Sequence, residues 1–150
     1  MQSITLAEAY AIESLRSNGY SSTDIIEKLK KGETEDFKSV SKNTDYSALE
    51  EMHASGNLES VLNDGYKVKF VTENGLKNLI RMKYGKEDGL DYIYDNNQIT
   101  GLQLDEEEQQ DLKNMLSQNW VFQAEENGVS ITPCGVENEH LILFSIFHIG

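Results

Sequence analysis

The chain has 150 residues, about the length of one domain with a single sizeable core. With 38% hydrophobic and 26% charged residues, its composition is that of a globular protein and excludes a chain that is disordered throughout. Its 26 acidic and 13 basic residues give a formal net charge of −13, which repels nucleic acid and anionic membranes at long range and suits cationic partners. A simpler interpretation, that the acidity only keeps the protein soluble, stays open beside it.

No segment of the sequence resembles an export signal or a membrane anchor, so neither is expected. The N-terminal residues, MQSITLAEAY, have neither a basic start nor an apolar run. The longest apolar stretch, residues 141–149, is shorter than the roughly 20 residues that a membrane-spanning helix needs. Because Cys134 is the only cysteine, no internal disulfide can form. We therefore expect a cytoplasmic protein without membrane contact.

Two helices are predicted at the N-terminus. Thr5 and Glu8 have the spacing of a capping box at the start of a helix over residues 5–18. A second helix is predicted over residues 22–31, where apolar residues recur at helical spacing until Gly32. Together they form an N-terminal helical hairpin.

The polar segment 33–45 is predicted to be a loop and to mark a domain boundary. It separates a helical hairpin, residues 1–32, from an α+β body, residues 46–150. One compact domain over residues 1–150 is the alternative.

Three helices and one strand are predicted between residues 46 and 85. In the strand, Tyr66, Val68 and Phe70 alternate with lysines, so these three residues are expected on its buried face. Turn or cap residues separate the elements, which are predicted at residues 46–54, 57–64, 66–72 and 73–84.

Beyond residue 85 the pattern predicts two hairpins, one helix and a terminal strand. Asparagines suit the tight turn of the first hairpin, Asp105 and Glu108 cap the helix, and Asn-Gly favours the second hairpin. The uncharged run 141–149 is predicted as a central strand. The chain as a whole is predicted to be α+β, with several helices and a mostly antiparallel sheet of about four to six strands.

The N-terminal hairpin has the proportions of a helix-turn-helix, which suggests DNA binding through residues 5–31. Leu15 departs from the motif, which usually has a small residue there. Residues 1–32 carry four acids and four bases, a poor balance for neutralising phosphates. In this alternative reading the residues facing DNA are Ser21, Ser22, Thr23 and Lys28.

Charge is segregated in the rest of the chain. Residues 66–86 carry six bases and one acid, and a basic patch there could bind phosphate or an acidic partner; it would contain Lys67, Lys69, Lys77 and Arg81. Residues 102–139 carry nine acids and one base, and the expected partner-binding residues are Glu106, Glu107, Glu108, Asp111, Glu125 and Glu126. Solvated faces that bind nothing are the alternative for both, because exposed ion pairs contribute only about 0–1 kcal/mol.

No constellation of catalytic or metal-binding residues is recognisable. The spacings of Cys134, His140 and His148 match no common zinc pattern, and the usual nucleotide-binding and hydrolase motifs are missing. We therefore expect no cofactor and no metal, and an enzyme of unsuspected type remains an alternative. The sequence favours a small acidic regulatory or protein-interaction domain that binds a protein partner or a second copy of itself. An inhibitor that imitates DNA is a sharper version of this hypothesis.

Overall fold

The computed structural model describes residues 1–41 and 44–134. The chain forms two compact units, unit 1 (residues 1–85) and unit 2 (residues 86–150). The elements of unit 1 are β1 (Gln2–Ile4), α1 (Leu6–Ser17), α2 (Ser22–Lys31), α3 (Glu35–Lys38), α4 (Ser47–Ala54), α5 (Leu58–Asp64), β2 (Tyr66–Val68) and α6 (Glu73–Tyr84). The described elements of unit 2 are β3 (Ile93–Asp95), β4 (Gln98–Leu102), α7 (Glu106–Met115), β5 (Trp120–Glu125) and β6 (Gly128–Pro133).

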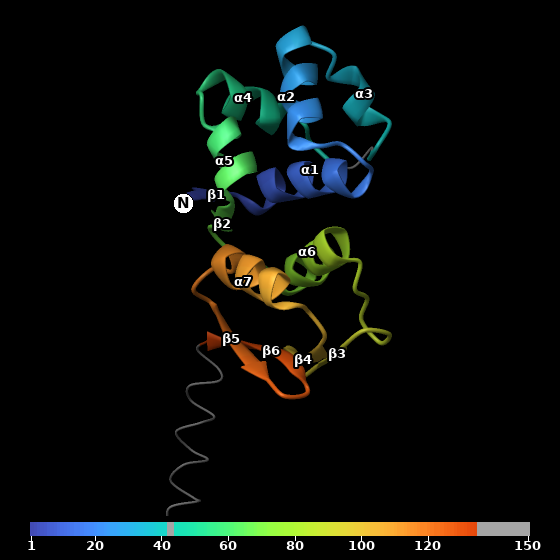
Figure 1. Cartoon of the computed structure of the whole chain (residues 1–150), viewed down its shortest axis with the longest axis vertical. Coiled ribbons are helices and arrows are strands. Elements are labelled where there is room, and N and C mark those ends of the chain that lie inside the picture. The colour runs from blue at the N-terminus through green and yellow to red at the C-terminus, as the bar shows by residue number, and fades with distance from the viewer. Residues whose placement is uncertain (42–43, 135–150) are drawn as a thin grey trace, which may run out of the picture. The chain divides into compact units, whose positions relative to one another are not determined.

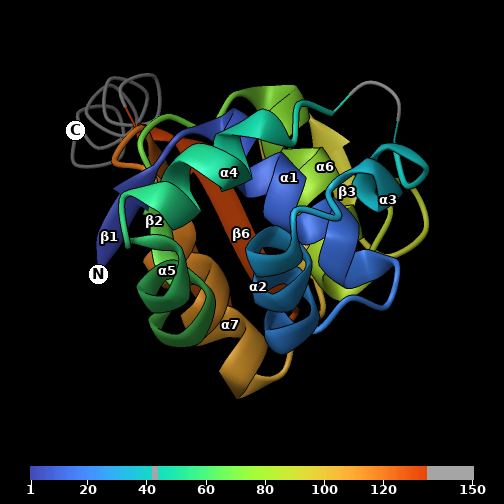
Figure 2. The ribbon, with the colours of Figure 1, turned by 90° about the horizontal axis from the view of Figure 1, so that it is seen from above.

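Helix α1 is the centre of unit 1. It packs against α6 on one side and α4 on the other (Figure 1), and α4 in turn contacts α2 and α5 (Figure 2). The side chains of residues 11–15 are all buried, so this part of α1 is enclosed by its neighbours. A helix enclosed in this way is held mainly by packing, because short helices are marginal in water on their own.

Local capping explains the limits of the first two helices. Thr5 and Glu8 form the predicted capping box at α1, and Ser21 forms a second one with Asp24 at α2. Helix α2 ends at Gly32, whose φ of 69° lies in the left-handed region that glycine adopts without strain. The predicted helical hairpin is therefore confirmed in outline.

The strand predicted over residues 66–72 is shorter than expected. Of the residues predicted to form it, 66–68 form the strand β2. This strand pairs in parallel with β1, with Gln2 opposite Tyr66. The chain then leaves the period of two: Val71 is fully buried, whereas Phe70 is 59% exposed. The placement of Phe70 on a buried face was therefore wrong, because alternation holds only while the backbone stays extended.

The segment 33–45 is more ordered than a plain loop in its described part. It contains the short helix α3, which buries Phe37. The Phe37 ring lies edge-on to Tyr20, with centroids 5.6 Å apart, and 5.7 Å from the ring of Tyr46. Residues 1–32 thus belong to the same compact unit as residues 46–85. A division at residues 33–45 stays a prediction about independent folding.

Unit 2 contains an antiparallel sheet with the strand order β3-β4-β6-β5. The β3–β4 turn falls at Asn96 and Asn97, whose φ values of 53° and 63° are those of a tight hairpin turn. Helix α7 lies over the sheet (Figure 1) and buries Leu112, Met115 and Leu116. The α+β class and the mostly antiparallel sheet are confirmed. The strand predicted at residues 141–149 lies outside the described residues.

Helices able to cross a membrane are not found among those described, since none is both long and apolar enough.

Candidate functional site: an acidic end of unit 2

The start of α7 concentrates carboxylates for a local reason. Asp105 is the N-cap and accepts a hydrogen bond from the Glu108 backbone N–H at 2.8 Å, while the Glu108 carboxylate accepts one from the Asp105 N–H at 3.1 Å. Negative charge near a helix N-terminus is also favoured by the helix dipole. The capping bonds account for Asp105 and Glu108, and the dipole also favours Glu106 and Glu107, which lie in the same first turn but take no part in the cap.

The turn of the β5–β6 hairpin lies against the segment that leads into α7. The Gln103 side-chain amide donates to the Asn127 carbonyl at 2.7 Å. A Cβ on Gly128 would lie 2.8 Å from the Gly101 carbonyl carbon and 2.9 Å from the Leu102 oxygen, so only glycine allows this approach. The hairpin turn therefore lies against residues 101–103, which lead into α7 at one end of unit 2.

Next to this contact, α7 and the β5–β6 hairpin carry four glutamates that are separate in the sequence. We call them the acidic end: Glu106, Glu107, Glu125 and Glu126. All four are exposed, and within the described part of the chain none of their carboxylates has a hydrogen-bond or ion-pair partner. Asp111 is exposed one helical turn after Glu107, whereas Glu108 is half-buried and engaged in the cap.

The acidic end belongs to a unit that is acidic throughout. Residues 86–134 carry eleven acidic side chains and two lysines, whereas residues 1–85 carry thirteen acidic and eleven basic ones. The carboxylates of this unit also affect Tyr92. Its pKa is raised to about 12, first by burial and then by the negative charges of Asp88, Asp91 and Glu87. Most of the protein's net charge is therefore carried by unit 2.

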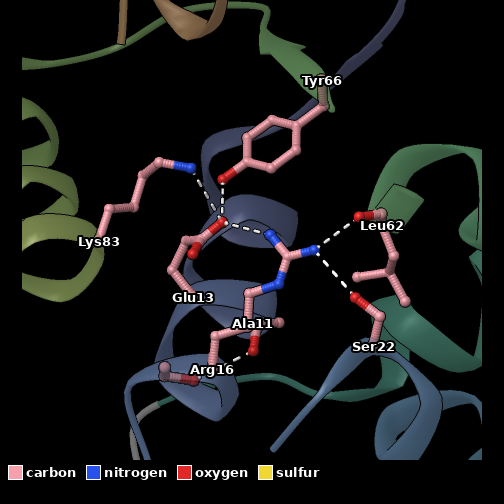
Figure 3. Close-up of polar contacts among 8 residues, drawn as sticks. Ala11, Glu13, Arg16, Ser22, Leu62, Tyr66 and Lys83 are labelled. Carbon is pink, nitrogen blue, oxygen red and sulfur yellow. Dashed lines mark hydrogen bonds and ion pairs between the residues drawn. The ribbon is translucent and has the colours of Figure 1, made fainter. Parts of the chain in front are cut away.

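Unit 1 contains a buried ionic cluster that no sequence pattern indicated (Figure 3). Glu13 on α1 is 3% exposed, and its Oε2 accepts from the Tyr66 hydroxyl at 2.5 Å, from Lys83 Nζ at 3.3 Å and from Arg16 at 3.3 Å. Arg16 also donates to the Leu62 carbonyl at 2.8 Å and to the Ser22 hydroxyl at 3.3 Å. The one available signal was that Glu13 shares a helix face with Ala9, four residues earlier.

The role of the cluster is structural, because it links several elements of unit 1. Its members come from α1, α6 and β2, and Arg16 extends it to α5 and α2. Buried charges need such pairing, because an uncompensated buried charge is costly. Each donor here already has its acceptor, so the arrangement does not present a reactive group to a substrate.

The predicted basic residues lie on two separate elements. Lys67 is on β2 and Lys69 follows it directly, while Lys77 and Arg81 share one face of α6. Arg81 borders a depression of about 460 Å³ beside Tyr10 and Asn78, and its guanidinium donates to the Asn78 side chain at 3.4 Å. A single basic patch of all four residues stays a prediction.

The residues predicted to face DNA are largely engaged within unit 1. The Ser21 hydroxyl caps α2, and the Ser22 hydroxyl accepts from Arg16. Lys28 forms ion pairs with Asp36 at 2.5 Å and with Glu33 at 3.3 Å, which raise the pKa of the lysine. Thr23 is exposed. These contacts give the DNA-binding alternative no support.

The structure offers no metal ligands in the residues that it describes, since no group of three or more histidine, cysteine or acidic side chains is arranged to hold an ion. Cys134 is half-buried, and its backbone N–H donates to the Asn119 carbonyl at 2.8 Å. His140 and His148 lie outside the described residues.

Fold and site together define an α+β protein with one balanced, mostly helical unit and one acidic unit. No family model matches the chain, and no curated protein or solved structure is significantly similar to it.

Proposed function

We propose that this protein is a protein-interaction domain that binds a basic partner through the acidic end of unit 2. The observation that carries the proposal is a set of four exposed glutamates, without partners among the described residues, on α7 and on the β5–β6 hairpin, whose adjoining segments are joined by the Gln103–Asn127 hydrogen bond. Such a surface is complementary to a cluster of lysines and arginines on another protein.

Electrostatics favours a partner over a purely solubilising role. Like charges placed side by side repel each other and cost stability, and a basic partner would relieve that repulsion. Complementary charge also speeds encounter and makes it sensitive to salt. If the acidity served solubility alone, the position of each carboxylate would not matter.

The test compares two quadruple variants of the full chain. The first replaces the four glutamates of the acidic end by glutamine. The control neutralises four exposed glutamates of unit 1 and so has the same net charge: Glu27, Glu51, Glu59 and Glu73. Circular dichroism confirms that both variants are folded.

Basic proteins captured from native lysate by the immobilised chain are identified, and their affinities are then measured by fluorescence anisotropy at low salt and at about 0.15 M. We expect the acidic-end variant to bind about tenfold more weakly or worse, since each lost contact contributes up to about 1 kcal/mol. The control should bind like the natural chain. Equal loss in both variants, or no basic protein retained even at low salt, would overturn the proposal.

Competition with duplex DNA tests the sharper version of this function. If the acidic end imitates DNA, the captured protein should itself bind DNA, and DNA should displace the chain. A partner that binds both at once would restrict the function to ordinary protein interaction.

A further inference from the structure

Among the residues that the structure describes, strand β5 is an edge of the sheet in unit 2. In the described strand order β3-β4-β6-β5 it pairs with β6 alone, and it is six residues long. Proteins usually protect such edges with proline, lysine or very short strands. The other edge, β3, has only three residues, whereas β5 has neither proline nor lysine.

The hairpin register shows which backbone groups point outward. Glu125 pairs with Gly128 across a two-residue turn, so this pair is hydrogen-bonded and the pairs alternate from there. Phe122 and Ala124 fall in the non-bonded pairs, and their N–H and C=O groups therefore face the open edge. Trp120 agrees with this register, because its N–H donates to the Ser117 carbonyl instead of to β6.

A groove lies between β5 and α7. Its volume is about 380 Å³, and it is lined by Glu106, Gln109, Gln110, Lys113, Phe122 and Ala124. Phe122 and Ala124 lie on the same face of β5, two residues apart, so the groove is where α7 leaves this face incompletely covered. Its charged lining residues are Glu106 of the acidic end and Lys113.

We propose that β5 is a docking site for an extended basic segment of the partner protein, which adds to the sheet as a fifth strand. Backbone hydrogen bonds to Phe122 and Ala124 would supply affinity, and alternate side chains of the segment would enter the groove. Charge complementarity identifies the occupant, since its basic residues would meet the acidic end. This inference rests on the proposed function and specifies its mode of binding.

The probe is a synthetic peptide of alternating lysine and valine, long enough to pair with all of β5. Two further peptides carry N-methyl groups on every lysine or on every valine, which removes alternate sets of N–H donors and leaves the charge unchanged. We expect the parent peptide to bind the full chain and at least one methylated peptide to bind about tenfold more weakly, because several backbone hydrogen bonds are lost. Binding of both methylated peptides as tightly as the parent would overturn docking on the edge.

Protein variants test the same surface. Ala124→Pro removes an N–H that faces the open edge and no ladder bond, so the hairpin should still form. With Ala124→Pro, the parent peptide should bind no more tightly than the methylated peptides. With Ala124→Gly, which keeps the N–H, the parent peptide should still bind more tightly. As a measurement on the natural chain, NMR should show the amides of Phe122 and Ala124 shifting and gaining protection from hydrogen exchange on peptide binding. Unchanged amides would contradict the proposal.

Other occupants are distinguished in the same assays. The proposal would be overturned if a peptide with the sequence of residues 135–150 bound tightly and the basic peptide did not. It would also be overturned if the chain dimerised and Ala124→Pro blocked the dimer. If basic proteins bind but the edge is not used, only this inference fails. If no basic ligand binds even at low salt, the proposed function fails with it.

Discussion

At the scale of single residues, Glu13 makes the most demanding interaction in the described part of unit 1. Its carboxylate is buried beside two cations and a tyrosine hydroxyl, and Lys83 is itself 8% exposed at the side chain. Pairing offsets the cost of removing these charges from water only while every partner is present. The cluster is therefore sensitive to the loss of any single member.

We expect Glu13→Gln to lower the free energy of unfolding of unit 1 by about 3–5 kcal/mol, because it removes the carboxylate charge that pairs with the buried Lys83 ammonium. Lys83→Met should cost less, since Glu13 keeps Tyr66 and Arg16 while an apolar side chain fills the space. Urea unfolding followed by far-ultraviolet circular dichroism measures both variants. A Lys83→Met variant less stable than Glu13→Gln would contradict this ranking.

At the scale of elements, capping decides where the helices begin. The boxes at α1, α2 and α7 each satisfy backbone N–H groups that the helix itself cannot satisfy. The box at α2 also depends on pH. Hydrogen bonds from the backbone and then the side chain of Ser21 lower the pKa of Asp24 below its ordinary value of 3.8.

This shift predicts the sign of a pH effect on α2. A lowered pKa in the folded state means that Asp24 adds stability above pH 3.8 and that this contribution is lost as the pH falls through the folded pKa. We expect Asp24→Asn to lose less stability than the natural chain on acidification through that range. Urea unfolding at a series of pH values gives the comparison, and parallel pH profiles for the two proteins would count against this role of Asp24.

At the scale of the whole molecule, the chain forms two compact units that differ in net charge. Unit 1 is nearly balanced and contains six of the seven described helices, while unit 2 is strongly acidic and contains Trp120, the only tryptophan. Helical signal and tryptophan fluorescence therefore report mainly on different units.

We expect urea unfolding of the full chain to give different midpoints by circular dichroism and by Trp120 fluorescence, since each unit is compact by itself. Glu13→Gln should shift the first midpoint and leave the second unchanged. Coincident transitions that move together in the variant would show that the chain unfolds as one cooperative body.

Most of the fold could be predicted because its signals are local. Thr5 with Glu8, Asp105 with Glu108, and the pair Asn96–Asn97 act within a few residues, so they determine helix starts and a hairpin turn wherever the segment lies. The short elements β1 and α3 were missed, since three or four residues are too few to show a period. The glutamates of the acidic end were identified from composition, but the contact of the β5–β6 turn with residues 101–103 was not.

The sequence by itself determined the identity and order of the long elements and the uneven charge, because these depend on neighbours along the chain. Tertiary structure decided the β1–β2 pairing, the burial of Glu13, the exposure of Phe70 and the contact of the β5–β6 turn with residues 101–103. These features depend on residues far apart in sequence, whose contacts follow from how the elements pack and not from any local preference.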